Sequence, residues 1–212
     1  MQKISDSTIR RLSTYYRTLS HLIEQGRQLI SSEEMAAIND ITAAQVRKDL
    51  SFFGNFGRRG VGYNTEELKQ EIGKILGLTK TWNIALVGVG NIGRALLDYQ
   101  EFKAQGFHFK ALFDVAPDKV GKEIHGLRIH HIDNVCPITK QEKIEIAIIA
   151  VPAKKAQEVV DEMVQCGVKA FLNFAPITVL VPPDVQVKYE NMSIELEALS
   201  YYLMSLDHKK KG

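Results

Sequence analysis

Three glycines with G-x-G-x-x-G spacing stand between a short apolar stretch and an amphipathic one. Residues 83–87 have the length and apolarity of a buried strand. In such a turn the first glycine permits a sharp bend, the second lets a ligand approach the backbone, and the third lets the next helix pack on the strand. The N-terminus of that helix offers N–H groups to a phosphate. We expect the pyrophosphate of a dinucleotide to bind at Gly88, Val89, Gly90, Asn91, Ile92 and Gly93.

An acidic residue ends the next predicted strand. Residues 109–113 are followed by Asp114 and Val115. Asp114 comes about 20 residues after the last glycine, where a carboxylate accepts hydrogen bonds from ribose hydroxyls and repels a 2′-phosphate. This pattern favours NAD over NADP. The alternative interpretation is that Asp114 is a turn residue or a helix N-cap ahead of Pro117.

Two further apolar stretches, 144–150 and 170–175, continue the alternation of strands and helices. In an open parallel sheet the ends of the strands border the ligand crevice. The alternative is that the residues at these ends form only core and turn. The candidate walls of a dinucleotide site are Ala150, Val151, Pro152, Asn173, Phe174, Ala175 and Pro176.

The first part of the chain is predicted to be helical with sharp turns. One short helix is expected to begin at a capping box of Ser31 and Glu34, and the next helix, over 42–50, at a box of Thr42 and Gln45. This is a helix-turn-helix pattern. The helix before them is expected to bury one apolar face, formed by Ile9, Leu12, Tyr16, Leu19 and Ile23.

A glycine-rich stretch, 53–63, follows and carries two adjacent arginines at its expected tip, which is typical of a wing hairpin. A helix with polar side chains on its first turns can enter a major groove, and an arginine tip can contact phosphates or the minor groove. The alternative is a helical protein-interaction module. The candidate DNA-binding residues are Thr42, Ala44, Gln45, Arg47, Lys48, Arg58, Arg59 and Gly60.

Apolar residues spaced by four and three mark the last predicted helix. Asn191 can cap its start. A narrow apolar seam of this kind suits packing on another subunit, and docking on its own domain is an equal alternative. The seam consists of Met192, Leu196, Leu199, Leu203 and Leu206.

The composition bounds the class of protein. The chain has 212 residues, 45% of them hydrophobic, and a net charge of +2. It has no apolar run of the ~20 residues that span a membrane and no secretory signal, so we expect a cytoplasmic protein. Cys136 and Cys166 lack zinc-site spacing and are predicted to be buried thiols. The expected fold is α/β, with a winged-helix domain over 1–80, a Rossmann-like dinucleotide-binding domain over 81–190, and a C-terminal dimerisation helix and tail over 191–212.

An enzyme is the main competing hypothesis. A dehydrogenase usually adds a substrate domain to its dinucleotide domain, and no chain is left over for one. A small NAD-dependent oxidoreductase with a helical appendage would reveal itself by hydride transfer. A third hypothesis, a related fold that takes coenzyme A or another adenine nucleotide, would be separated by competition binding. The histidines that could donate protons, none of them in a motif, are His108, His125, His130 and His131.

Several stretches of the chain match one known family. They are residues 11–12, 15–19, 41–54, 56–63, 88–93, 113–114 and 173–176. On these motifs the chain resembles Rex, the bacterial redox-sensing transcriptional repressors, over nearly its full length. The stretch 41–54 is the most specific of them, whereas the glycine motif alone would fit many proteins.

This resemblance implies a homodimer that binds a palindromic operator in double-stranded DNA and takes NADH or NAD⁺ as a regulatory ligand. NADH would reorient the dimer and release the operator, and the C-terminal helices would be swapped between subunits. Tyr99 matches a family tyrosine near the nicotinamide. The family often places an aspartate where Asn191 stands, paired with the arginine that matches Arg17. A neutral amide can replace that charged pair only by a weaker hydrogen bond.

Overall fold

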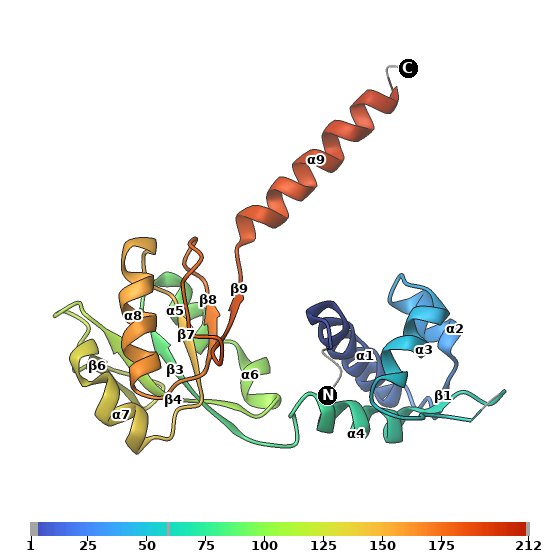
Figure 1. Cartoon of the computed structure of the whole chain (residues 1–212), viewed down its shortest axis with the longest axis horizontal. Helices are drawn as coiled ribbons and strands as arrows, with labels where there is room; N and C mark the ends of the chain where they lie inside the picture. The colour runs from blue at the N-terminus through green and yellow to red at the C-terminus, as the bar shows by residue number, and fades with distance from the viewer. Residues whose placement is uncertain (1–3, 59, 211–212) are drawn as a thin grey trace. The chain divides into compact units, whose positions relative to one another are not determined.

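Two units make up the chain, residues 1–80 and residues 81–212. The computed structural model describes residues 4–58 and 60–210. The first unit is helical with a short two-stranded sheet, and the second alternates strands and helices around a larger sheet (Figure 1). Each unit buries its own apolar side chains.

The helices of the first unit share one core. Its central side chains are fully buried and come from α1, from the helix pair α2 and α3, and from α4. A two-residue antiparallel ladder between β1 and β2 closes the unit. The elements are α1 (Asp6–Glu24), β1 (Leu29–Ile30), α2 (Ser32–Ile38), α3 (Ala43–Ser51), β2 (Tyr63–Asn64) and α4 (Thr65–Ile75).

The buried side of α1 differs from the predicted one. Ile9, expected in the core, is 37% exposed, and Tyr16 and Ile23 are only partly buried. Tyr15 is fully buried instead, because its apolar ring packs in the core while its hydroxyl donates to a buried carboxylate. The core side chains of α1 are Leu12, Tyr15, Leu19 and Leu22.

The capping boxes begin α2 and α3 as predicted, although only one box is complete. Ser31 Oγ accepts from the Glu34 N–H at 3.0 Å, and the Glu34 carboxylate accepts from the Ser31 N–H at 2.9 Å. Thr42 Oγ1 accepts from the Gln45 N–H at 3.1 Å. The Gln45 amide does not turn back to Thr42, because it donates to Asp49 one helical turn further on.

The second unit is built on a sheet that has seven strands in the described residues, in the order β5-β6-β4-β3-β7-β8-β9. Neighbouring strands are parallel, except β5 and β6. The chain builds one half of the sheet outward from β3 and then returns to β7 on the other side, which is the Rossmann strand order and places the switch point between β3 and β7. The strands are β3 (Trp82–Val87), β4 (Phe107–Asp114), β5 (Glu123–Ile124), β6 (Leu127–His131), β7 (Ile146–Ile149), β8 (Ala170–Asn173) and β9 (Gln186–Tyr189).

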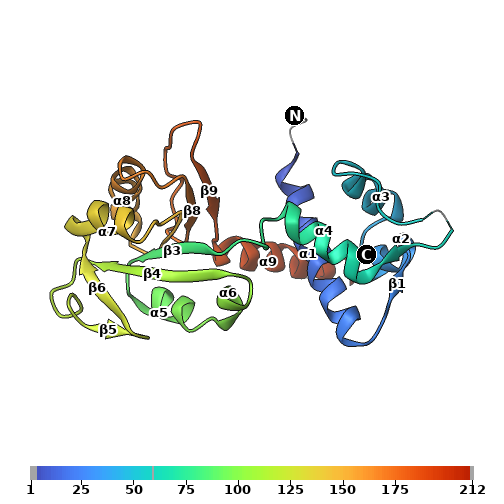
Figure 2. The ribbon, with the colours of Figure 1, turned by 90° about the horizontal axis from the view of Figure 1, so that it is seen from below.

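Helices cover both faces of this sheet. Figure 2 shows α5 and α6 on one face and α7 and α8 on the other. Successive side chains of β3 point to opposite faces of the sheet. Leu86 packs in the apolar cluster under α5 and α6, and Val87 packs in the cluster under α8. The apolar run of this strand is therefore buried on both sides. The helices are α5 (Asn91–Leu97), α6 (Gln100–Ala104), the 3₁₀ helix η1 (Ile132–Asn134), α7 (Val135–Gln141), α8 (Ala153–Gln165) and α9 (Met192–Lys210).

Cys136 and Cys166 are joined by a disulfide, so the prediction that both are thiols is wrong. Cys136 lies in the first turn of α7, and Cys166 is the C-cap of α8. Their Cα atoms lie 4.9 Å apart, a separation that a disulfide can bridge. The two cysteines are 30 residues apart in the sequence, so only the packing of α7 on α8 brings them together.

The last helix, α9, exposes apolar side chains along its length. Asn191 Oδ1 accepts from the Ser193 N–H at 3.0 Å, which confirms the predicted cap. Apolar residues outside the predicted seam, such as Ile194 and Tyr201, are also exposed, so the apolar surface of α9 is broader than the seam. Within the described ranges, no helix has the length and apolarity needed to cross a membrane. The side chains more than half exposed are Met192, Ile194, Leu196, Leu199, Tyr201, Tyr202, Leu203 and Met204.

Reduction of the disulfide is expected to destabilise the second unit. Closing a loop of this length removes conformational entropy from the unfolded chain and stabilises the fold by about 3–4 kcal/mol. For a unit of this size the midpoint of thermal unfolding should fall by roughly 10 °C when a dithiol is added. Calorimetry of the full chain measures the shift. A Cys136→Ala/Cys166→Ala variant should unfold at the lower temperature, and adding the dithiol should not change that temperature. A dithiol-dependent change in the unfolding temperature of this variant would contradict the assignment.

Candidate functional site

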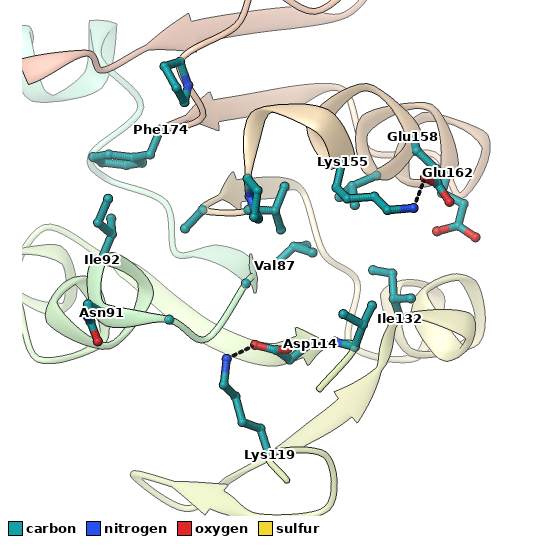
Figure 3. A pocket seen from close by; sticks show the side chains of 18 of the residues that line it. Val87, Asn91, Ile92, Asp114, Lys119, Ile132, Lys155, Glu158, Glu162 and Phe174 are labelled. Carbon is teal, nitrogen blue, oxygen red and sulfur yellow. Dashed lines mark hydrogen bonds and ion pairs between the residues drawn. The ribbon is translucent and has the colours of Figure 1, made fainter. Parts of the chain in front are cut away.

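A cavity of about 750 Å³ lies at the carboxyl ends of β3 and β7 (Figure 3). This volume suits a small-molecule ligand, and the position is the switch point of the sheet, where Rossmann-like folds bind nucleotides. Most of the predicted dinucleotide site is brought together here. The predicted residues that line the cavity are Gly88, Gly90, Asn91, Ile92, Asp114, Val115, Ala150, Val151, Pro152, Phe174 and Pro176.

The three glycines of the turn have different surroundings. Gly88 has φ +95°, and a Cβ there would overlap the carbonyl oxygen of Ala150. Gly93 is buried in α5, and a Cβ there would overlap the carbonyl oxygen of Gly88, so the helix approaches the turn as closely as backbone allows. A Cβ at Gly90 meets no atom within 4 Å. The structure therefore needs Gly88 and Gly93 for the fold and leaves Gly90 for close approach by a ligand.

The Asp114 carboxylate holds the glycine turn against the end of β4. Its Oδ2 accepts from the Val89 N–H at 2.8 Å and from Lys119 Nζ at 2.9 Å. Its Oδ1 accepts from the N–H groups of Val115 and Ala116, as in the turn-residue alternative. Burial alone would raise the pKa of Asp114, but these backbone and lysine donors hold it below its ordinary value. The Asp114 carboxylate is thus an anion at the cavity, with Lys119 as its charged partner.

Asn173 and Ala175, two of the predicted wall residues, support the wall from behind. The Asn173 side chain is fully buried and donates to the carbonyl oxygens of Ala175 and Ile177, while it accepts from the Ala175 N–H. This turn fixes Phe174 and Pro176 at the cavity. Asn173 and Ala175 therefore match the alternative interpretation, in which the ends of these strands form only core and turn.

Tyr99 is one of the predicted ligand residues that do not line the cavity. It is 53% exposed at the start of α6, where its ring meets Phe102 edge-on with centroids 5.1 Å apart. Val89 and Gly93 are also outside the lining, since both are buried beneath the turn. Nothing in the described residues tests a contact of Tyr99 with a ligand, so that role stays a prediction.

Sequence reasoning missed the charged side of the cavity. Lys155 and Glu158, 2.8 Å apart on α8, face it one helical turn apart, and Ile132 enters from the neighbouring η1 (Figure 3). The spacing of three and four along α8 is a signal that could have been read as one helix face. The described residues contain no group of histidine, cysteine and acidic side chains that could hold a metal ion. The missed lining residues are Val87, Lys119, Ile132, Asp133, Lys155, Glu158, Val159 and Glu162.

The predicted DNA-binding helix, α3, presents its polar side as expected. Val46 and Leu50 are buried, whereas Thr42, Ala44 and Lys48 are exposed. The other two predicted DNA-binding residues of this helix bond to protein partners. Gln45 Nε2 donates to Asp49 at 2.8 Å, and Arg47 Nη1 donates to Ser32 Oγ at 2.7 Å and to Glu33 at 2.9 Å.

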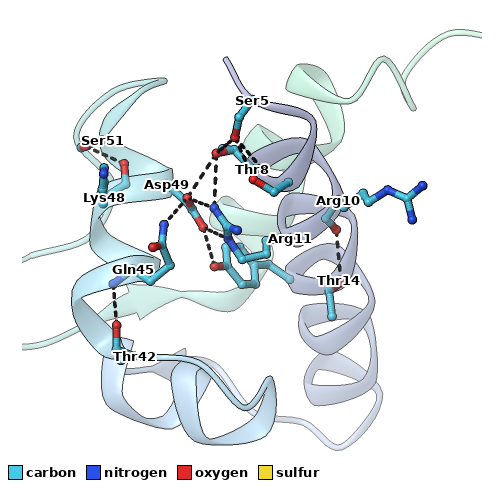
Figure 4. Close-up of polar contacts among 12 residues, drawn as sticks. Ser5, Thr8, Arg10, Arg11, Thr14, Thr42, Gln45, Lys48, Asp49 and Ser51 are labelled. Carbon is cyan, nitrogen blue, oxygen red and sulfur yellow. Dashed lines mark hydrogen bonds and ion pairs between the residues drawn. The ribbon is translucent and has the colours of Figure 1, made fainter. Parts of the chain in front are cut away.

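A buried carboxylate ties α3 to α1 (Figure 4). Asp49 is fully buried and accepts two bonds from the Arg11 guanidinium, at 2.6 and 2.7 Å, and one from the Tyr15 hydroxyl at 2.8 Å. Burial would raise the pKa of Asp49, but the bonds from Arg11, Tyr15 and Gln45 outweigh it and lower the pKa below its ordinary value. Tyr15 has a raised pKa because of its burial and its bond to Asp49. The network sets the position of α3 on the unit.

The predicted wing is a tight backbone reversal. The Arg58 N–H donates to the Gly62 carbonyl and the Gly62 N–H to the Arg58 carbonyl, at 3.0 and 3.1 Å. Gly57 has φ +78°, and a Cβ there would lie 2.5 Å from the Gly62 oxygen, so this reversal requires glycine. Arg58 and Gly60 are exposed at its end. Arg59 lies outside the described residues.

Two family models match the chain. The description "Putative DNA-binding protein N-terminus" matches residues 3–51, which contain α1 to α3. The description "CoA binding domain" matches residues 79–177, which contain the glycine turn and β8. The two matches fall on the two units described above.

Relatives match nearly the whole chain. A redox-sensing transcriptional repressor Rex from Roseiflexus sp. (strain RS-1) is 44% identical over 203 residues, which cover 96% of this chain and 92% of the relative. The crystal structure of RSP in complex with β-NAD⁺ and operator DNA is 38% identical with a TM-score of 0.93, covering 100% of this chain and 97% of that one. RSP in complex with β-NADH is 37% identical with a TM-score of 0.91, covering 100% and 99%.

The fold and the cavity define a class: proteins that join a winged-helix unit to a Rossmann-like unit with a nucleotide cavity at its switch point. The expected α/β fold class is confirmed. The chain belongs to the Rex family of redox-sensing transcriptional repressors, which confirms the resemblance read from the motifs.

Replacing Arg11 by methionine is expected to lower the free energy of unfolding of the first unit by about 3 kcal/mol, because the buried Asp49 carboxylate loses its charged partner. Arg10, exposed on the same helix and pointing away from Asp49 in Figure 4, provides the control. Arg10→Met should change stability by no more than about 0.5 kcal/mol. Denaturant unfolding measures both, and equal effects would refute the assigned role of the Asp49 network.

The same pair also predicts a pH dependence. Since the folded pKa of Asp49 is lowered, its stabilising contribution is present above its unfolded pKa, about 3.9, and is lost as the pH falls through the folded value. The stability gap between wild type and Arg11→Met should therefore narrow below about pH 4. A gap that stays constant between pH 7 and pH 3 would contradict this assignment.

Alanine substitutions at Gly93 and at Gly90 should separate an effect on folding from an effect on ligand binding. Gly93→Ala forces a Cβ onto the Gly88 carbonyl and should destabilise the second unit by about 1–3 kcal/mol. Gly90→Ala has space within the protein but places a methyl group at the cavity, so stability should be kept while NADH affinity falls about tenfold. Thermal unfolding and NADH titration of both variants check this. Wild-type NADH affinity in Gly90→Ala would show that the ligand binds elsewhere.

Proposed function

We propose that the protein is a DNA-binding transcriptional repressor that senses the ratio of NADH to NAD⁺. The observation that carries this proposal is one chain with both a helix-turn-helix unit and a switch-point cavity, similar over its full length to a protein solved with β-NAD⁺ and operator DNA and with β-NADH. NADH binding to the second unit reorients a dimer so that its two DNA-binding units no longer fit one operator.

The cavity residues fit a dinucleotide. Gly90 leaves space for a pyrophosphate at the N-terminus of α5, and the Asp114 carboxylate accepts from the adenosine ribose. The hydrophobic walls of Val151 and Phe174 suit the planar rings. Tyr99 is proposed to sense the nicotinamide. The full proposed set is Gly88, Val89, Gly90, Asn91, Ile92, Gly93, Tyr99, Asp114, Val115, Ala150, Val151, Pro152, Asn173, Phe174, Ala175 and Pro176.

The DNA-binding role rests on α3 and the wing. Lys48 is exposed on α3 and Arg58 on the wing, where each can meet a phosphate. Arg47 must exchange its bonds to Ser32 and Glu33 for a base or a phosphate, so DNA competes with two protein acceptors. The full proposed set is Thr42, Ala44, Gln45, Arg47, Lys48, Arg58, Arg59 and Gly60.

We assign the domains and the assembly as follows. Residues 1–80 bind DNA, residues 81–190 bind the dinucleotide, and residues 191–212 form the dimerisation helix and tail. The exposed apolar residues of α9 support a homodimer, since a surface of this kind is normally covered. A palindromic operator suits that two-fold symmetry, and a DNA partner supports a cytoplasmic location.

Regulation without catalysis completes the proposal. No enzyme role is assigned, because the relatives are repressors. In this proposal NADH acts only through its binding energy and undergoes no reaction. For a tenfold change in DNA affinity, it must favour the DNA-free arrangement by about 1.4 kcal/mol, and DNA must weaken NADH binding by the same factor.

Fluorescence anisotropy of an AT-rich palindromic duplex at fixed salt tests this function, because phosphate contacts make affinity salt-dependent. NADH should release the duplex at least about tenfold more effectively than NAD⁺ or NADPH. Equal effects of NADH and NAD⁺ would refute the sensor. Absence of specific DNA binding with steady oxidation of NADH would favour the oxidoreductase alternative.

Arg47→Ala should weaken binding of the specific duplex by about 1–3 kcal/mol if Arg47 reads a base. A scrambled duplex of equal length is the control, because its binding depends on phosphate contacts alone. An equal loss on both duplexes would show that Arg47 contacts a phosphate and does not read a base.

A further inference from the structure

The disulfide lies beside the cavity but is not part of its lining. Cys136 lies in the first turn of α7, which directly follows η1, and η1 supplies Ile132 and Asp133 to the cavity. Cys166 caps α8, which supplies Glu158 and other lining residues. The bond therefore joins α8, which lines the cavity, to α7, which is continuous with the lining helix η1. Ile132 and Cys136 pack against the same buried cluster that contains Val159 and Cys166.

We propose that Cys136 and Cys166 form a reversible thiol–disulfide site that sets the affinity of the cavity for NADH. The proposal rests on the function proposed above, since a DNA-binding protein works where small thiols keep most cysteines reduced. In that compartment a protein disulfide is usually transient and redox-sensing. Cys136 and Cys166 are the two cysteines of the sequence, so oxidation within one chain can form only the disulfide between them.

The exchange reaction balances with small thiols as the reductant. A thiolate attacks Sγ of Cys136, which is partly exposed, whereas Cys166 is only 6% exposed. The Sγ–Sγ bond breaks, and Cys166 leaves with the electron pair and takes up a proton. A second thiolate attacks the small-molecule sulfur of the mixed disulfide and releases Cys136 as a thiol. Two small thiols are oxidised to one disulfide, and the protein disulfide is reduced by two electrons.

The bond acts on affinity through preorganisation. With the disulfide closed, η1–α7 and α8 are held together before a ligand enters, so less conformational entropy is lost on binding. With the disulfide open, the ligand must also order this side of the cavity. NADH therefore binds the oxidised form more tightly, and by reciprocity it favours the disulfide by the same factor. Oxidising conditions in the thiol pool make the repressor more responsive to NADH.

NADH titration of the full chain with the disulfide closed and opened tests the proposal. Reduction by a dithiol should raise the dissociation constant for NADH by about threefold or more, while titration of thiols in denaturant rises from none to two per chain. The Cys136→Ser/Cys166→Ser variant should bind NADH like the reduced wild type and ignore the dithiol. If that variant does not fold, the two forms of the wild type carry the test alone.

Equal dissociation constants for the two wild-type forms would overturn the proposal. So would two thiols that persist after equilibration with an excess of a small-molecule disulfide. Operator release by NADH is measured separately on the same samples. Release with equal dissociation constants keeps the repressor and overturns the thiol site, whereas unequal constants without release keep the thiol site and overturn the repressor. No NADH binding by either form overturns both.

Discussion

The dinucleotide cavity depends on one buried carboxylate. Asp114 accepts donors from the glycine turn, from its own strand end and from Lys119, so every lone-pair direction has a partner. Because an unpaired N–H in this place would be unfavourable by about 1–3 kcal/mol, the Val89 bond fixes the turn against β4. Gly93 packs directly against Gly88 of the same turn, with no space for a Cβ between them. The cavity is therefore formed before any ligand enters it.

Local patterns predicted the elements of this site but not all of their contacts. The strand over 83–87 and the following glycine turn are encoded within a dozen residues, so the sequence is sufficient to place them. The partner of Asp114 at Val89 depends on the pairing of β3 with β4, which periodicity does not report. Glu158 was not predicted as a lining residue, because only the packing of α8 decides which face of that helix lines the cavity.

The DNA-binding unit shows a related limit. The capping residues and the buried Val46 and Leu50 follow from spacing alone. Asp49 looks like an ordinary exposed acid in the sequence, and its burial depends on Arg11, which is 38 residues away along the chain. Once buried, it takes Gln45 as a further donor and orders one of the polar groups assigned to DNA reading. Fixing a reading group in advance reduces the side-chain entropy lost when DNA binds.

The exposed apolar side chains of α9 make the concentration of the protein matter. They lie on several sides of the helix, between acidic residues such as Glu195 and Glu197, so one neighbouring helix would not cover them all. Uncovered apolar surface of this kind associates with other apolar surface. If a second copy of the chain supplies the cover, as proposed above, the fraction of covered helices rises with the concentration of the protein. The amount of the protein in a cell would then influence repression together with NADH.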